Sequence, residues 1–239
     1  LSPRALVERA ASMGVQVLAL TDHDELAGLD EARAVAEEVG IRLVQGVEIS
    51  ITWAGHTIHV VGLNVDSDDP ILGRGLASNR GGRAERARRM ADELARMGIP
   101  GALEGAYKFA GNQDLIGRTH FARFLVERGV VKDVKTVFRK FLVKGKPGYV
   151  PHQWASLEEA LVWIRAAGGQ SVLAHPGRYQ MGREKMRLLL SEFKHLGGDA
   201  IEVVTGSHTP DQVPVYADLA VEFDLMRSEE RRVGKECRM

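Results

Sequence analysis

Apolar and polar positions along the first third of the chain follow the rhythm of alternating helices and strands. Apolar residues at helical spacing predict helices over residues 2–13 and 25–39. Unbroken apolar or β-branched runs predict buried strands over residues 15–20, 41–47 and 56–65. Because strands that alternate with helices usually lie parallel, this part of the chain is expected to form a largely parallel sheet or barrel.

A long helical stretch interrupts this alternation. Residues 71–143 keep helical spacing, are rich in Arg and Lys, and carry almost no strand signal. Alternation then returns, with predicted helices at 157–167, 184–196 and 213–223 and predicted strands at 171–174 and 200–204. We therefore expect an α/β fold whose body, residues 1–66 and 148–226, is interrupted by an all-helical insertion at 67–147.

Residues that can bind metals follow or lie within several of the predicted strands. The sequence TDHD at 21–24 comes directly after the first strand, and Glu48, His59 and His175 lie at or near the ends of three others. Ligand sites of strand–helix folds gather at the carboxyl edge of the sheet, so these side chains are expected to converge. Mixed imidazole and carboxylate ligands suit Mn, Fe or Zn.

Each of these residues also has a structural interpretation. His175 precedes Pro176 and can belong to a simple turn, Glu48 can cap the next segment, and His59 can be a hydrogen-bonded core histidine. Four such residues at separate strand ends are hard to reach by chance, so their conjunction favours the metal site.

Composition excludes several classes of protein. The 239 residues include 32 Lys and Arg against 32 Asp and Glu, so net charge provides no steering toward DNA or a membrane surface. The single cysteine, Cys237, allows neither a disulfide framework nor a cysteine-based zinc site. Neither a signal peptide nor an apolar run of membrane-spanning length is recognisable. We expect a cytoplasmic protein that forms no stable complex with DNA; its oligomeric state is left open.

Four motifs in this order resemble those of the PHP (polymerase and histidinol phosphatase) family. They are LALTDHD at 18–24, GVEIS at 46–50, HTIHVVG at 56–62 and AHPGRY at 174–179. The helical insertion is similar to that of the 3′,5′-nucleoside bisphosphate phosphatases, a group that includes an RNase trimming short RNA from the 5′ end. The resemblance implies a metal-dependent phosphoester hydrolase acting on nucleoside bisphosphates or short RNA.

The same resemblance implies the architecture and ligands of the site. The fold would be a distorted (β/α)7 barrel, incomplete here, with up to three divalent ions. These are usually Mn²⁺, with Fe²⁺, Zn²⁺ or Mg²⁺ as alternatives. His23, Glu48, His59 and His175 match metal ligands, with Glu48 bridging two ions, and we expect His23, Glu48 and His175 to take part in catalysis.

Basic residues of the insertion fit a doubly phosphorylated substrate, because arginine binds phosphate through two parallel hydrogen bonds. By resemblance, we expect the substrate contacts to be Arg80, Arg83, Arg118, His120 and Arg178. The other arginines of the first basic helix, Arg86, Arg88 and Arg89, are expected to form its solvated face. His208, in a loop, is given less weight.

Both ends of the chain differ from the family pattern. The chain opens on Ser2 and Pro3, a typical helix N-cap and first turn, without the family's first strand carrying His-x-His. It also lacks the final strand carrying Asp-x-His. Residues 227–237 match, codon by codon, the translation of a common sequencing-adapter read, so residues 227–239 are expected to be a non-native tail. We expect such a fragment to bind metal weakly and to turn over little or nothing. Manganese stoichiometry and phosphatase rates on the fragment and on a full-length version would test this.

Two other functions are compatible with the sequence. A PHP phosphatase could act on another ester such as histidinol phosphate. Comparing the rates on adenosine 3′,5′-bisphosphate and on histidinol phosphate would distinguish the two substrates. The basic insertion could instead make the chain a non-catalytic nucleic-acid-binding module, whose RNA affinity would depend steeply on salt without any metal.

Overall fold

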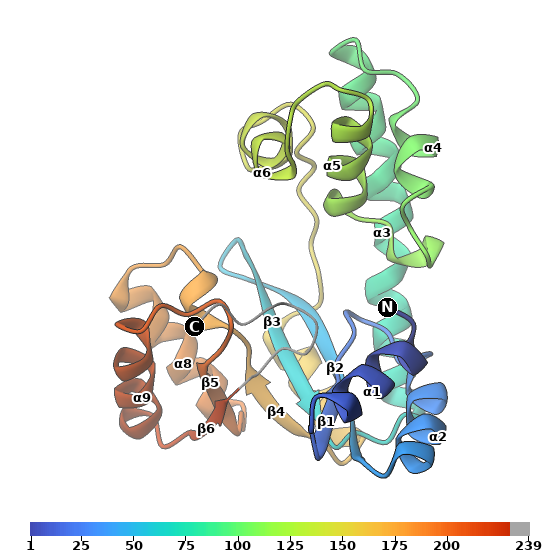
Figure 1. The fold of residues 1–239 in the computed structure, drawn as a ribbon. Coiled ribbons are helices and arrows are strands. Elements are labelled where there is room, and N and C mark those ends of the chain that lie inside the picture. The colour runs from blue at the N-terminus through green and yellow to red at the C-terminus, as the bar shows by residue number, and fades with distance from the viewer. Residues whose placement is uncertain (230–239) are drawn as a thin grey trace. The chain divides into compact units, whose positions relative to one another are not determined.

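The computed structural model describes residues 1–229, which form two compact units (Figure 1). The first, here called the α/β unit, combines Leu1–Leu76 with the segment that begins at Trp154. The second, the helical unit, is Ala77–Gln153. The insertion predicted at 67–147 differs from the helical unit at both ends. The helical unit starts later than predicted because Leu72 and Leu76 belong to the core of the α/β unit.

Helices and strands alternate through most of the α/β unit. In chain order its elements are α1 (Pro3–Ser12), β1 (Val17–Leu20), α2 (Leu29–Val39), β2 (Arg42–Trp53), β3 (His56–Leu63), the start of α3 (Pro70–Arg96), α7 (Leu157–Ala166), β4 (Gln170–Leu173), the 3₁₀ turn η3 (Pro176–Arg178), α8 (Arg183–His195), β5 (Ala200–Val204), α9 (Gln212–Glu222) and β6 (Met226–Glu229). The helical unit holds the rest of α3, then α4 (Ala102–Tyr107), η1 (Gln113–Leu115), α5 (Arg118–Glu127), α6 (Val134–Val137) and the π-helical turn η2 (Phe138–Leu142).

Within the described residues, six strands form one sheet in the order β1-β2-β3-β4-β5-β6 (Figure 1). The prediction of a largely parallel sheet is wrong for its centre. β1 with β2, β4 with β5, and β5 with β6 are parallel, whereas β2 with β3 and β3 with β4 are antiparallel. The reason is a hairpin, in which Ala54 and Gly55, both at positive φ, turn the chain between the paired residues Trp53 and His56.

One predicted helix start, after the first motif, and one predicted strand end, in the second motif, are also corrected. The helix predicted from residue 25 begins at Leu29, because residues 25–28 form a turn in which the Glu25 carboxylate accepts the Leu26 and Ala27 N–H groups. The strand predicted to end at residue 47 continues as β2 to Trp53. Glu48 and His59 therefore lie inside the β2–β3 hairpin and not at strand ends.

Local sequence explains where several helices begin and end. The Ser2 side chain accepts the Ala5 N–H at 3.2 Å and Pro3 opens α1, as predicted from the sequence. At α7, Ser156 and Glu159 form a reciprocal capping box. Gly40 ends α2 in the left-handed conformation, with φ at 74°.

Each unit encloses its own apolar core. In the α/β unit, apolar residues of β2–β5 pack against the start of α3 and against α7, α8 and α9, while α1 and α2 cover β1. In the helical unit, Met90 and Leu94 of α3 belong to a core shared with α4, α5 and the segment around Leu142. These cores hold the strands that carry the candidate ligands in fixed register.

The arginines on the basic face of α3 are not all exposed to solvent as predicted. Arg88 and Arg89 are exposed, as expected. Arg86 is not on a solvated face, because it is half-buried and its Nε donates to the Val150 carbonyl at 3.1 Å. The predicted non-native tail lies outside the described residues beyond Glu229, while residues 227–229 belong to β6. Among the described residues, no helix combines the length and apolar character needed to cross a membrane.

Candidate metal centre

The turn after β1 is held against the middle of β2. The Glu48 N–H donates to the Asp22 carbonyl, and the Asp24 N–H donates to the Glu48 carbonyl, both at 3.0 Å. Asp24 is fully buried at a φ of 53°, and its carboxylate accepts the N–H and the hydroxyl of Ser50 at 2.8 and 2.9 Å. These contacts fix His23, between the two aspartates, beside Glu48.

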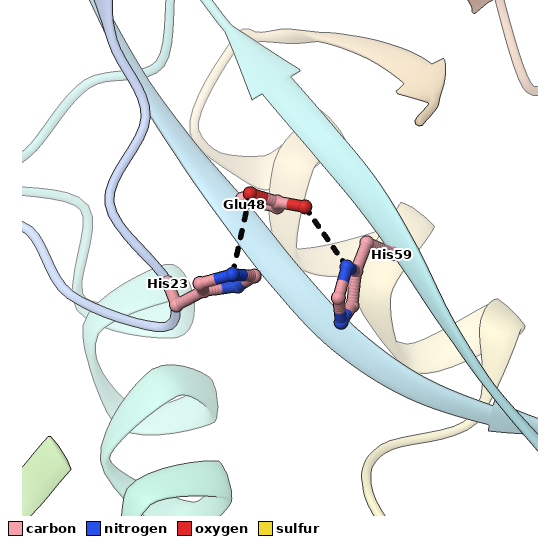
Figure 2. Close-up of side chains that lie close together, drawn as sticks. All are labelled: His23, Glu48 and His59. Carbon is pink, nitrogen blue, oxygen red and sulfur yellow. Dashed lines mark ion pairs between the residues drawn. The ribbon is translucent and has the colours of Figure 1, made fainter. Parts of the chain in front are cut away.

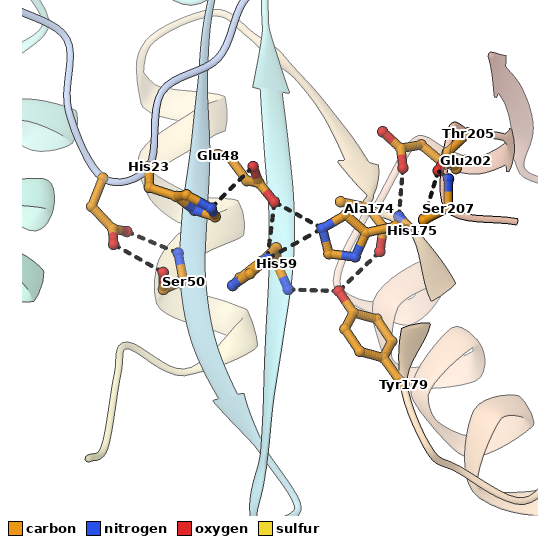
Figure 3. A network of polar contacts seen from close by, with 11 residues as sticks. His23, Glu48, Ser50, His59, Ala174, His175, Tyr179, Glu202, Thr205 and Ser207 are labelled. Atoms are coloured by element: carbon orange, nitrogen blue, oxygen red, sulfur yellow. Dashed lines mark hydrogen bonds and ion pairs between the residues drawn. The ribbon is translucent and has the colours of Figure 1, made fainter. Parts of the chain in front are cut away.

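Three imidazoles converge on the Glu48 carboxylate (Figures 2 and 3). Oε1 of Glu48 lies 2.8 Å from Nε2 of His175 and 2.9 Å from Nδ1 of His59. Oε2 lies 3.5 Å from Nε2 of His23. The side chains of Glu48 and His175 are 11% and 2% exposed, whereas that of His23 is 51% exposed. The cluster therefore runs from the sheet interior to the solvent.

Hydrogen bonds of its backbone groups fix the turn that carries His175. His175 has a φ of 31° and a ψ of 56°, which is rare for a residue with a side chain. Its N–H donates to the buried carboxylate of Glu202 at 2.5 Å, and its carbonyl accepts the Arg178 N–H at 2.9 Å. One residue farther, the Gly177 N–H donates to Nε2 of His208 at 3.0 Å. Such over-determined local conformations are a feature of functional sites.

The charge of Glu48 is set by competing effects. Burial alone would raise the pKa of the Glu48 carboxyl, but the hydrogen bonds with His175 and His59 and the charge of His23 hold it well below its usual range. Glu48 is therefore a carboxylate at neutral pH.

The donor set fits a divalent metal. Nδ1 of His59 and Nε2 of His175 are 3.2 Å apart, and both lie within 2.9 Å of Glu48 Oε1. Donor atoms that share one ion at about 2.0–2.1 Å lie roughly 3 Å from each other. His23, Glu48 and His59 place one ligand atom each within 4.8 Å of one another. In addition, Nδ1 of His175 is buried and has no hydrogen-bond partner within the described residues.

The sequence profile of the PHP domain matches residues 1–167. The chain belongs to the PHP domain family. It is 52% identical over 217 residues to a 3′,5′-nucleoside bisphosphate phosphatase of Chromobacterium violaceum, covering 91% of this chain and 76% of that protein. It is 42% identical over 239 residues to the 5′-3′ exoribonuclease Rnm of Escherichia coli, covering 99% of this chain and 81% of that protein.

The PHP assignment extends to the fold. A Bifidobacterium adolescentis structure assigned to the metal-dependent phosphoesterases superimposes with a TM-score of 0.85 at 28% identity, covering 98% of this chain and 84% of that one. The chain therefore has the α/β fold of a metal-dependent phosphoesterase, with a His and Glu cluster that can hold a metal.

The predicted substrate residues of this PHP chain fall into both units. Arg178 is exposed in η3 of the α/β unit, and the other four, Arg80, Arg83, Arg118 and His120, lie half-buried in the helical unit. Nδ1 of His120 accepts the Gly117 N–H at 3.1 Å, which requires an unprotonated Nδ1. Burial, Arg123 and Arg83 lower the pKa of His120, so it is neutral at pH 7.

A group of arginines is partly withdrawn from solvent in the helical unit. Burial lowers the pKa of Arg118, whose guanidinium lies 5.8 Å from the centre of the Phe138 ring. Burial and the charges of Arg118 and Arg83 lower the pKa of Arg86 to about 10. Positive groups that are brought together and partly desolvated favour an anion between or beside them.

Two residues beside the cluster, Glu202 and Tyr179, received no role in the sequence analysis, and His208 was given less weight. Glu202 holds the His175 turn, Tyr179 contacts the backbone beside it, and His208 supports the next glycine. A charged residue inside the apolar strand AIEVV was the available signal for Glu202. Tyr179 lies within the quoted motif AHPGRY, but nothing in the spacing indicates what its hydroxyl contacts.

Proposed function

We propose that this PHP protein is a metal-dependent phosphoester hydrolase that releases phosphate from nucleoside 3′,5′-bisphosphates and trims short RNA from the 5′ end. The convergence of His23, His59 and His175 on the Glu48 carboxylate carries this proposal. The activities of the C. violaceum phosphatase and the E. coli exoribonuclease support the substrate class.

We assign the metal-ligand role to His23, Glu48, His59 and His175, and the bridging role to Glu48. Mn²⁺ is the proposed ion, with up to three ions in the complete centre. The chemistry of the donors supports this choice, because mixed imidazole and carboxylate ligands bind intermediate divalent ions. Divalent ions supply polarisation of a phosphoryl oxygen and a more acidic water.

The protein's own residues prepare the site for such ions. Glu48 stays ionised, so it offers two charged oxygens without having to release a proton. His175 and His59 are fixed by the backbone of their strands and turn, which lowers the cost of ordering them on binding. His23 is the most exposed of the four and lies where solvent reaches the cluster. This gradient supports a role for His23 at the substrate-facing side.

The helical unit contributes phosphate-binding groups. We propose that Arg80, Arg83, Arg118 and His120 contact the substrate, together with Arg178 of the α/β unit. The support lies in the helical unit, where Arg83 and Arg118 are close enough to the partly desolvated Arg86 to lower its pKa, and such concentrated positive charge suits a phosphate group. Neutral His120 can donate a hydrogen bond through Nε2 while its Nδ1 accepts from Gly117.

The test compares metal binding and phosphate release in one preparation. Purified protein is titrated with Mn²⁺ and assayed with adenosine 3′,5′-bisphosphate, a 5′-phosphorylated oligoribonucleotide and histidinol phosphate. We expect Mn²⁺-dependent phosphate release that is faster with the bisphosphate than with histidinol phosphate.

Arg83→Ala is expected to raise the KM for the bisphosphate while Mn²⁺ affinity stays unchanged. Arg88→Ala, an exposed arginine of the same helix, is the matched control and should leave both unchanged. Faster release from histidinol phosphate, or no Mn²⁺-dependent release from any of the three esters by a full-length version of the protein, would overturn the proposed function.

A further inference from the structure

The antiparallel ladder between β3 and β4 is interrupted where the candidate ligands begin. The paired residues run from Leu63 with Gln170 to Val60 with Leu173, so the next pair in register is His59 with Ala174. In a hydrogen-bonded antiparallel pair, the N–H of each residue donates to the carbonyl of the other. The first bond is present, because the Ala174 N–H donates to the His59 carbonyl at 3.1 Å.

The second bond of this pair is replaced by a side chain. The His59 N–H donates to the Tyr179 hydroxyl at 2.8 Å, and that hydroxyl donates to the Ala174 carbonyl at 2.9 Å (Figure 3). Both backbone groups are satisfied, but through an inserted oxygen atom. The Tyr179 hydroxyl thus holds β3 and β4 apart at one point while keeping them connected.

This point lies next to two candidate ligands. His59 is itself a member of the spread pair, and His175 directly follows Ala174. Their ring nitrogens, Nδ1 and Nε2, lie 3.2 Å apart and share Oε1 of Glu48. The Tyr179 ring also stands edge-on to the His175 ring, with centroids 5.6 Å apart. The two imidazoles therefore belong to a residue of the spread pair and to the residue that directly follows it.

We propose that Tyr179 is a positioning residue, whose hydroxyl, inserted between His59 and Ala174, sets the spacing of His59 and His175 for metal binding. This inference rests on the proposed metal centre and deepens it. Without the hydroxyl, either the pair closes into a direct bond, which moves the imidazoles, or two backbone groups lose their partners. Either change disturbs ligand spacing, and losing such an outer partner typically costs about 10–100-fold in metal affinity.

Tyr179→Phe isolates the hydroxyl, because the ring and its packing against His175 are kept. Mn²⁺ affinity is measured by titration, following the EPR signal of the free ion. We expect the Mn²⁺ dissociation constant of Tyr179→Phe to rise about 10–100-fold. The matched control is Tyr216→Phe, which removes a hydroxyl from the half-buried Tyr216 in the same unit and should leave Mn²⁺ affinity unchanged.

A measurement without metal tests directly whether the Tyr179 hydroxyl lies between His59 and Ala174. Hydrogen exchange of the His59 amide, followed by NMR without Mn²⁺, should change in Tyr179→Phe, whereas the Val61 amide in the next bonded pair should keep its protection. A merely structural role would lower the melting temperature without changing Mn²⁺ affinity measured well below it.

The outcomes separate this inference from the proposed function. If the unaltered protein binds no Mn²⁺, the metal centre fails and the role of Tyr179 fails with it. If the unaltered protein binds Mn²⁺ and Tyr179→Phe binds it equally well, only the Tyr179 inference is overturned. Should Tyr179→Phe not fold, 3-fluorotyrosine at this position keeps a hydroxyl that accepts the His59 N–H and donates to the Ala174 carbonyl. It should then keep Mn²⁺ affinity near that of the unaltered protein, and a folded variant that binds weakly would contradict the inference.

Discussion

Nε2 of His175 lies 2.8 Å from Oε1 of Glu48, although the two residues are 127 positions apart in the chain. Glu48 comes from the interior of β2, and His175 from the turn that follows β4. β3 lies between these strands and contributes His59 to the same oxygen. The central antiparallel part of the sheet thus assembles most of the cluster, and the turn after β1 adds His23.

Glu48→Gln should weaken Mn²⁺ binding more than any substitution outside the proposed ligand set. The substitution removes the negative charge and one of the two oxygens on which the three imidazoles converge. We expect Mn²⁺ affinity to fall about 100-fold or more, at or above the upper range for outer-sphere changes, and phosphate release to fall with it. Calorimetric Mn²⁺ titration measures the effect.

Glu222→Gln provides the control for Glu48→Gln, because Glu222 is a surface carboxylate paired with Arg187. It should retain Mn²⁺ affinity. Unchanged affinity in Glu48→Gln would remove Glu48 from the proposed ligand set.

Asp24→Ala should destabilise the α/β unit. It leaves the Ser50 N–H and hydroxyl without their buried acceptor and places alanine at a φ of 53°. We expect a loss of about 2–4 kcal/mol in the free energy of unfolding. Urea unfolding followed by tryptophan fluorescence is the measurement, since all three tryptophans lie in this unit: Trp53, Trp154 and Trp163.

The control for Asp24→Ala is Asp224→Ala. Asp224 also has a positive φ, at 51°, but its carboxylate makes an exposed ion pair with Lys194 and no buried hydrogen bond within residues 1–229. The expected loss is about 1–2 kcal/mol, mainly the left-handed conformation. Equal losses in the two variants would show that the buried hydrogen bonds of Asp24 contribute nothing.

His120 should make the stability of the helical unit depend on pH. Burial and the charges of Arg123 and Arg83 lower its pKa from 6.5 in the folded state. As pH falls below 6.5, the unfolded chain takes up this proton first, so stability declines until the folded pKa is reached. Above 6.5 the group contributes no pH dependence. An NMR titration should place the His120 midpoint below 6.5, and His120→Gln should flatten the acid side of the stability profile. A midpoint at or above 6.5 contradicts the argument.

Two glycines of α3 should respond to alanine in opposite directions. A Cβ at Gly75 would lie 2.3 Å from Cδ2 of the Trp163 indole, whereas a Cβ at Gly73 meets nothing within 4 Å. Gly73→Ala should stabilise the α/β unit by about 0.5–1 kcal/mol through helix propensity. Gly75→Ala should destabilise it by about 1–3 kcal/mol, because the indole must move. Urea unfolding and Trp163 emission measure both, and stabilisation by Gly75→Ala would be the contrary result.

Much of the α/β rhythm could be predicted from hydrophobic spacing alone. β5 lies at the predicted residues 200–204, and α7, α8 and α9 differ from prediction by one residue at one or both ends. The strand around His59 begins at residue 56 as predicted and ends two residues earlier, but the strand around Glu48 could not be delimited in the same way. Polar residues inside β2 end an apolar run as a loop would, although here they serve the cluster and not the core.

Long-range contacts explain what local sequence did not predict. Residues 25–28 form a turn, so α2 begins four residues later than predicted. The preceding Asp24 is held by Ser50, which lies 26 positions later in the chain. The Tyr179 hydroxyl enters the ladder 120 positions from His59. Helical and strand periodicity report burial of single elements, so they carry no information on such pairings.

The pairing of β3 with β4 closes a loop that contains the whole helical unit. The entropy lost on closing a loop grows only with the logarithm of its length, by about 0.6 kcal/mol for each doubling. Lengthening, shortening or replacing the helical unit would therefore change the free energy of assembling Glu48, His59 and His175 very little. Segments of different length and sequence can therefore occupy this position in the chain without altering how Glu48, His59 and His175 are brought together.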